Sequence, residues 1–422
     1  MMEIDSNQST TSSHTALSTS TPGHTSVRLN SSDVLEDYLL SPSTAGNLLH
    51  FAESTTSPRG THIPAYQLSS SPPSIPAPRA MELLCVNATK AVRGPQTPAR
   101  LKNGTGGAYI LRNEKREPIG VFKPADEEPF CENNPNGYTS SGAVDRAKKR
   151  GVPAGESSCR EVAAFLLDHG GFANVPPTAA ITLSHPAFAY RSHDALHPKS
   201  GSFQQWVPHV AESWDFGPSR FSTQEIHAIG VLDIRVLNCD RHGGNLLVTE
   251  DGHLVPIDHG YILPSTLDEA WFEWLIWPQA KRPFSAATVQ YVLSLSVEDD
   301  VQLLRGCVWN GRPISAACVR VFRCVNVLLQ LGVRSGLTLY DIGLLVCRMD
   351  PHIPCALERI ACEAVSRAAG GSCPAQTGPF ETGSVLQDEQ FAAVKSEERF
   401  QKEFVELAAA VVERTARCKA SN

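Results

Sequence analysis

The spacing of hydrophobic residues changes along the chain from a strand-like period to a helical one. In the first half, β-prone runs at residues 107–111 and 118–124 flank the polar segment RNEKRE, which predicts a hairpin. The segments AAITLSH and GSFQQWVPH predict further strands, and apolar runs on either side of Asp251-Gly252 predict a second hairpin. Helical spacing occurs at residues 81–93, at 159–169, from about 223, and repeatedly after about 285.

A strand-rich part followed by a helix-rich part predicts an α+β protein in two parts. The first 80 residues differ from the rest, because 27 of them are Ser or Thr. Such a stretch buries too little apolar surface to offset the entropy of ordering, so it is predicted to be disordered. We therefore expect a disordered stretch at 1–80, a first lobe at 81–207 and a second lobe at 208–365. At 366–422 we expect a linker and a C-terminal helix, which is charged and lies near 386–417.

Composition and charge exclude several classes of protein. The chain is 41% hydrophobic and 19% charged, as in globular proteins, and it has no long apolar run or secretory leader pattern. A net charge of −7 argues against nucleic acid as a partner. The 12 cysteines include no C-x-x-C pair, which favours free thiols in a reducing compartment over a zinc site. We expect a cytoplasmic protein without a transmembrane segment.

The strongest chemical pattern is NCDRHGGNLLV followed by VPIDHGY. It places Asp240, Asn245 and Asp258 within nineteen residues, with the second predicted hairpin between the last two. Phosphoryl transfer from ATP needs a carboxylate for the acceptor hydroxyl and oxygen ligands for a metal ion between the phosphates. The spacing of Asp240 and Asn245 matches the D-x-x-x-x-N of kinase catalytic loops. Each residue alone would be an ordinary turn or surface residue, but together and in this order they predict a phosphotransferase site.

Residues suited to holding phosphates precede this pattern. Lys123 lies in an apolar strand, where a buried ammonium needs an anionic partner. Glu161 on the following helix is predicted to pair with it, and Glu156 is the alternative. A glycine-rich loop whose backbone could approach phosphate oxygens opens the first hairpin, although an ordinary loop would look the same. This loop contains Gly104, Thr105, Gly106 and Gly107.

The sequence resembles the phosphatidylinositol 3-/4-kinase superfamily over roughly residues 81–350. The shared pieces include GTGGAYIL, VFKPADEEPF, REVAAFLLDHGGF, VLDIRVLNCDRHGGNLLV and VPIDHGYILP, in the order and about the spacing of that superfamily. The segments EEPF and FEWLIWPQA are most similar to the gamma-type phosphatidylinositol 4-kinases of plants and algae. The resemblance implies a bilobal protein-kinase-like fold, with a first lobe of antiparallel sheet plus helix and a mainly helical second lobe.

The resemblance also implies roles for individual residues. Lys123 would grip the ATP phosphates beneath the loop at 104–107, and Asp240 would orient or deprotonate the acceptor hydroxyl. His242 would stabilise charge on the transferring phosphoryl group, while Asn245 and Asp258 would hold Mg²⁺, or Mn²⁺ in its place. The hinge that binds adenine through its backbone would be Gln204, Gln205, Trp206 and Val207.

The implied reaction is ATP-dependent phosphorylation of phosphatidylinositol at the inositol 4-hydroxyl, by a protein bound peripherally to a membrane. A serine/threonine protein kinase with the same ATP site is the first alternative, and a non-catalytic adaptor is the second. Aromatic residues at 271–277 beside Lys281 and Arg282 fit either packing of the second lobe, which we favour, or contact with a membrane. The basic stretch at 146–150 is either a second contact for lipid phosphates or a solvated loop.

Overall fold

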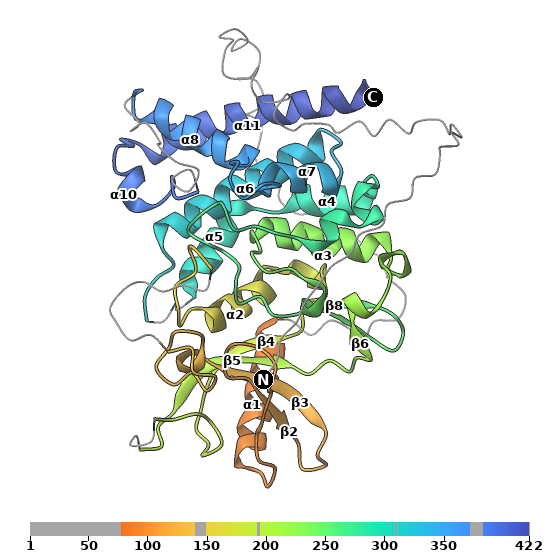
Figure 1. Ribbon diagram of the computed structural model, residues 1–422, viewed down its shortest axis with the longest axis vertical. Coiled ribbons are helices and arrows are strands. Elements are labelled where there is room, and N and C mark those ends of the chain that lie inside the picture. Colours follow the sequence, from red (N-terminus) through yellow and green to blue (C-terminus); the bar gives the residue numbers. More distant parts are fainter. Residues whose placement is uncertain are drawn as a thin grey trace, which may run out of the picture. The chain divides into compact units, whose positions relative to one another are not determined.

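The computed structural model describes residues 77–139, 149–191, 195–307, 309, 311–371 and 383–421. Expectations for residues 1–76, for the start of the basic stretch at 146–148, and for most of the linker lie outside these residues. Two sets of elements make up the described part: a sheet with covering helices, called the N-lobe below, and a helical C-lobe (Figure 1).

The N-lobe contains a five-stranded antiparallel sheet with the spatial order β1-β2-β3-β5-β4. Its predicted hairpin and further strands are confirmed. The elements are α1 (Ala77–Arg93), β1 (Ala99–Arg100), β2 (Tyr109–Arg112), β3 (Pro118–Pro124), α2 (Ser157–Leu167), β4 (Thr178–Leu183) and β5 (Lys199–Gln205).

Alternation along β3 decides which of its side chains face the site. Phe122 is fully buried in a core that also holds Leu84 and Ala88 of α1, so α1 covers this face of the sheet. Successive side chains of a strand point to opposite faces, so Lys123 emerges on the other face, where α2 lies. Strand β3 is held on both sides, by β2 and by β5, and Lys123 pairs in register with Ser202.

The C-lobe consists of helices and one small three-stranded sheet, ordered β6-β7-β8. The predicted hairpin around Asp251 is confirmed as β7 and β8, and the predicted helix at Thr223 begins at that residue. The elements are β6 (Ala211–Glu212), α3 (Thr223–Arg235), β7 (Leu246–Val248), β8 (Leu254–Pro256), α4 (Ala286–Ser294), α5 (Val297–Gly306), α6 (Ala316–Arg334), α7 (Leu339–Val346), α8 (Ala356–Ala368), α10 (Asp388–Phe391) and α11 (Glu397–Ala420).

The C-lobe core gathers around α6 and reaches α2 in the other lobe. Phe322 of α6 and Leu232 of α3 belong to the same buried cluster as Ala163 and Leu167 of α2. Helix α2 therefore contacts both the sheet and the helical core. Helix α6 is long and apolar enough to pass as a membrane span, but 72% of that stretch is buried inside the protein, as in the core helix of a globular domain.

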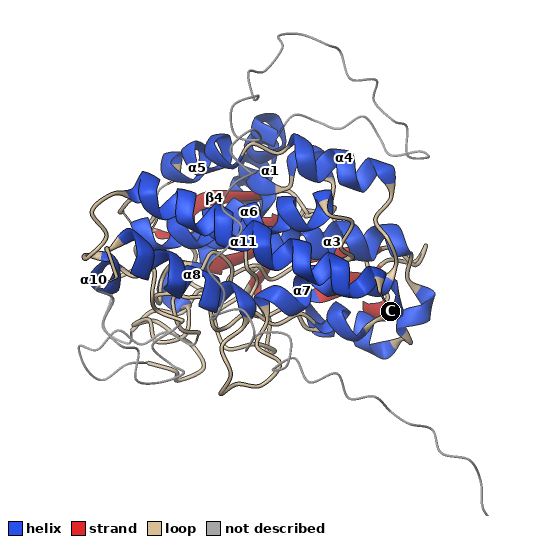
Figure 2. Cartoon of the chain, turned by 90° about the horizontal axis from the view of Figure 1, so that it is seen from above, coloured by secondary structure: helices blue, strands red, loops and turns tan. Residues whose placement is uncertain are grey.

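The C-terminal helix differs from its prediction. A charged helix was expected near 386–417, but the long helix begins at Glu397, with Ser396 as its N-cap, and a separate short turn forms α10. Helix α11 lies across α8 and α6 (Figure 2) and buries Phe400 and Phe404.

Candidate active site

Three charged groups from three distant elements meet where α2 faces the sheet. The ammonium of Lys123 on β3 forms an ion pair with Glu161 of α2 and lies 3.1 Å from Oδ1 of Asp258, which follows β8. Glu156 instead pairs with Arg160, at 2.6 Å. Of the two glutamates considered from sequence, the structure therefore places Glu161 against Lys123.

Burial and charge set the protonation states of this cluster. The ammonium of Lys123 lowers the pKa of Asp258 to about 2, so this carboxylate stays ionised at neutral pH. The two carboxylates raise the pKa of Lys123 despite its burial, so the amine stays charged. Burial raises the pKa of Glu161, which makes its ionised form dependent on Lys123. Asp258 has a φ of +54°, a conformation that non-glycine residues adopt rarely and that occurs often at functional sites.

The loop after α3 carries Asp240 and Asn245 to the same region. The Asn245 side-chain amide donates to the backbone carbonyl of Asp240 at 2.9 Å, which fixes the two residues relative to each other. The backbone N–H of Ile257 donates to the carbonyl of Asn245 at 3.0 Å, so Asn245 lies beside the strand that leads into Asp258. The predicted hairpin thus brings the two proposed metal ligands together.

A buried Arg–Asp pair that the sequence analysis missed supports this loop. Arg241 is fully buried, and its guanidinium donates to Asp233 of α3 and to the carbonyls of Asn245 and Ile257. Asp233 also accepts a hydrogen bond from the indole of Trp274, at 2.9 Å. The sequence feature that could have indicated this pair is a carboxylate within the apolar helix run GVLDIRVL. A carboxylate in such a run is buried only when it has hydrogen-bond or charge partners.

The His259 ring is held neutral beside this network. Its Nε2 accepts a hydrogen bond from Arg241, and its backbone N–H donates to Glu161 at 3.0 Å. Burial, together with the charge of Arg241, lowers the pKa of His259 well below its ordinary value. His259 therefore links the Asp240–Asn245 loop to the Lys123–Glu161 pair without adding a charge.

His242 lies beneath an exposed tryptophan. Its ring stacks on Trp214, with centroids 5.6 Å apart, and its Nδ1 accepts a hydrogen bond from the N–H of Gly244. Residues 243 and 244 lie close beneath the same tryptophan, because a Cβ at Gly244 would come within 2.5 Å of its ring. The position of His242 next to Asp240 agrees with the role that the resemblance implied, and that role remains a prediction.

The glycine-rich loop lies between β1 and β2 and reaches toward the residues after Asp258. The side chain of Tyr261 hydrogen-bonds Thr105, which brings the loop beside the DHGY segment. Gly107 has no room for a side chain, because a Cβ there would overlap the Glu127 carboxylate, and Gly104 has a φ of +96°. Side-chain amides of the 131–139 segment donate to the carbonyls of Gly104, Thr105 and Gly106.

Some hydrogen-bond donors of the predicted hinge are already used within the N-lobe. The N–H of Gln205 donates to Pro177, and that of Trp206 donates to Ile119 at 3.1 Å. The Gln204 side chain donates to Thr178. Within the described part of the chain the Val207 N–H makes no hydrogen bond to another backbone group, so it is the backbone donor of this segment left for a ligand.

The aromatic segment divides between core and surface. Phe272, Trp274 and Trp277 are buried, which confirms the favoured packing interpretation for them, while Trp271 and Ile276 are exposed. Lys281 lies over the ring of Tyr340, and Arg282 donates to Thr223. At the end of the basic stretch, Lys149 lies near Asp240 and Arg150 pairs with Asp268.

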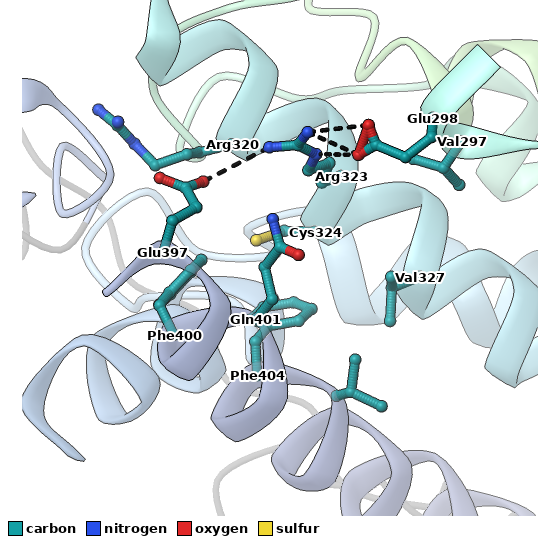
Figure 3. A pocket seen from close by; sticks show the side chains of 11 residues that line it. Val297, Glu298, Arg320, Arg323, Cys324, Val327, Glu397, Phe400, Gln401 and Phe404 are labelled. Atoms are coloured by element: carbon teal, nitrogen blue, oxygen red, sulfur yellow. Dashed lines mark hydrogen bonds and ion pairs between the residues drawn. The ribbon is translucent and has the colours of Figure 1, made fainter. Parts of the chain in front are cut away.

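A cavity in the C-lobe is unsuited to ATP. It has a volume of about 160 Å³ and lies between α5, α6 and α11, far smaller than typical sites for drug-sized ligands (Figure 3). Its charges already pair with one another, because Arg323 contacts both Glu298 and Glu397. It is a packing gap beneath the C-terminal helix.

The fold and the site together define a protein of the kinase-fold class. A sheet lysine is paired with a helix glutamate, and in the C-lobe an Asp–Asn loop is followed by a hairpin that leads into an aspartate at the same lysine. The family model for phosphatidylinositol 3- and 4-kinases matches residues 104–342, and the chain belongs to this family.

Curated relatives agree with this assignment. Phosphatidylinositol 4-kinase gamma 4 of Arabidopsis thaliana is 41% identical over 288 residues, covering 64% of this chain and 50% of that protein. Phosphatidylinositol 4-kinase gamma 6 of the same plant is 38% identical over 351 residues, covering 75% of this chain and 55% of that protein. The chain thus spans about half the length of the curated relatives it matches.

Proposed function

We propose that this protein transfers the γ-phosphoryl group of ATP to the inositol 4-hydroxyl of phosphatidylinositol. The observation that carries the proposal is the meeting of Lys123, Glu161 and Asp258, from three elements far apart in sequence, beside the Asp240–Asn245 loop. Family membership and the names of the curated relatives point to the lipid acceptor.

Each group in the site has a distinct task. Lys123, held by Glu161, donates to the ATP phosphates beneath the glycine-rich loop, and the Val207 N–H donates to the adenine ring. The Asn245 amide oxygen and the half-exposed Asp258 carboxylate are the hard oxygen ligands that Mg²⁺ prefers, and this ion supplies charge neutralisation between the phosphates when bound. Asp240 accepts the proton of the attacking hydroxyl. Catalysis rests on positioning and charge stabilisation.

An acceptor assay tests the proposal. Purified protein is incubated with γ-labelled ATP and either vesicles containing phosphatidylinositol or a mixture of proteins, with Asp240→Ala as the matched control. We expect label in the lipid, and alkaline deacylation followed by chromatography should place it on the 4-position. Label in polypeptide alone would show a protein kinase, and no label in either acceptor would favour the adaptor.

Exposed apolar side chains near the catalytic loop support contact with a membrane. Trp214 covers Gly243 and Gly244, and the segment that carries Trp271 and Ile276 pairs with the same loop through Arg241 and Glu273. Trp214 is 58% exposed and Ile276 78% exposed. Tryptophan and large aliphatic residues insert favourably at the boundary between lipid headgroups and acyl chains.

Replacing Ile276 with serine should weaken binding to phosphatidylinositol vesicles by about tenfold, because the burial of an aliphatic side chain is worth ~1.5 kcal/mol. Co-sedimentation with vesicles measures the effect. Val405→Ser on α11, an exposed aliphatic residue at the far end of the C-lobe, is the control and should bind like the unmodified protein. Equal binding by both variants would remove the 271–276 segment from the membrane contact.

A further inference from the structure

Residues 149–152, at the end of the basic stretch, form a tight turn that packs against the segment after Asp258. Lys149 and Val152 form a bridge across a tight reversal at Gly151, and Val152 is buried. The N–H of Ser265 donates to the Gly151 carbonyl at 2.8 Å, and a Cβ at Gly151 would lie 2.7 Å from the N–H nitrogen of Thr266. The turn therefore packs closely against the 258–268 segment, and position 151 has room only for glycine.

Arg150 anchors this reversal and fixes the direction of its neighbour. Its guanidinium pairs with the buried Asp268 and donates to Ser384 at 2.9 Å. Arg150 is held by these contacts, and the neighbouring Lys149 lies at Asp240. The Nζ of Lys149 is 3.8 Å from Oδ1 of Asp240. The sequence left open whether both cations contact lipid phosphates or lie in a solvated loop, and the structure gives them different partners.

The Lys149–Asp240 contact has the features of an open site. At 3.8 Å the ammonium is beyond hydrogen-bonding distance of the carboxylate, and the side chains remain 26% and 22% exposed. An ion pair that only held the fold would be expected to close to direct contact, as Arg150 and Asp268 do. The ammonium thus keeps hydrogen-bond donors for an oxygen that arrives between the two groups.

The Asp240–Asn245 loop has no cation of its own available to the transferring phosphoryl group among its described residues. Arg241 follows Asp240 directly, but it is fully buried and occupied by Asp233 and backbone carbonyls. The loose transition state of phosphoryl transfer spreads negative charge over the equatorial oxygens of the transferring phosphoryl group. This group lies next to the residue that receives the proton of the acceptor hydroxyl. A cation within 4 Å of Asp240 is near that group. The phosphodiester of phosphatidylinositol lies across the ring from the 4-hydroxyl, and is therefore further away.

We propose that Lys149 is a catalytic residue that donates to the phosphoryl group during its transfer. The inference rests on the proposed function. The acceptor oxygen forms a bond to the γ-phosphorus, the bond to the β–γ bridging oxygen breaks, and ADP leaves with that electron pair. The hydroxyl proton passes to Asp240, and the Lys149 ammonium keeps its protons while its N–H groups bind the equatorial oxygens.

The test compares Lys149→Gln with Lys149→Arg and with Lys115→Gln, a neutralised exposed lysine in the β2–β3 turn. Loss of one transition-state donor predicts that Lys149→Gln lowers kcat by about 10²-fold, with the KM values for ATP and lipid within about twofold of the unmodified protein. Lys149→Arg should recover part of the loss, and Lys115→Gln should lose nothing.

A binding measurement separates this inference from the choice of acceptor. MgADP with aluminium fluoride mimics the transferring phosphoryl group and needs no lipid. Its affinity should fall by about the same factor in Lys149→Gln, while the affinity for MgADP alone, read by thermal shift, stays unchanged. Unchanged affinity for the fluoride complex would overturn the proposal. A raised KM for lipid at constant kcat would also overturn it, placing Lys149 on the lipid phosphate instead.

Discussion

Replacing Lys123 with alanine is expected to reduce turnover by at least about 10³-fold while the protein stays folded. The substitution removes the proposed donor to the ATP phosphates, and it also leaves the buried Glu161 facing Asp258 without the cation between them. Glu161 should then take up a proton, because burial already raises its pKa and Lys123 is the main group opposing that rise. Initial rates with saturating acceptor measure the loss.

Nucleotide binding provides the second readout for this variant. The unmodified protein should be stabilised against heat by MgATP, and Lys123→Ala should lose most of that stabilisation. Lys115→Ala, an exposed lysine outside the site, serves as the matched control and should keep both activity and stabilisation. A Lys123→Ala protein that turns over at a normal rate would show that phosphate binding occurs elsewhere.

Asp240→Ala should lower turnover by about 10³-fold and leave MgATP binding intact. The proposed function assigns this side chain to the acceptor hydroxyl, whereas it assigns Lys123, Asn245 and Asp258 to the nucleotide and the metal. The backbone carbonyl that holds Asn245 is kept by the substitution, so the metal site should survive. Rates and thermal shifts with MgATP, measured on the same preparation, separate the two effects.

Asp240→Asn keeps the size of the side chain and tests the charge alone. It should be nearly as inactive as Asp240→Ala, because the amide does not accept the hydroxyl proton. Normal turnover by both variants would show that Asp240 is not the proton acceptor. Normal function in cells without turnover would favour the adaptor interpretation.

The fold was predictable where local pattern and tertiary structure agree. Alternating apolar residues identified β2 and β3, and the Asp251-Gly252 turn identified the β7–β8 hairpin. The C-terminal helix was less well predicted, because its start depends on Ser396 accepting from the N–H of Arg399 rather than on apolar spacing. The covering of the sheet by α1 also came only from the structure, since a single amphipathic helix does not specify its partner.

The choice between Glu156 and Glu161 shows where sequence reasoning stopped. The two residues are five positions apart, so on a helix they point about 140° away from each other. Only the placement of α2 against β3 decides which one meets Lys123. Glu161 faces the lysine, and Glu156 at the helix start turns to Arg160.

The amino-acid sequence determined the order and chemical type of the groups in the site: a lysine, a glutamate on the next helix, then aspartate, asparagine and aspartate around a hairpin. The aspartate, asparagine and aspartate around the hairpin were readable because their spacing is local, whereas the lysine and the glutamate lie in separate segments. The tertiary structure decided which cations hold the protein together and which reach Asp240. Arg241 and Arg150 are bound to Asp233 and Asp268, while Lys149 reaches Asp240, because burial and partners are set by contacts between segments distant in sequence.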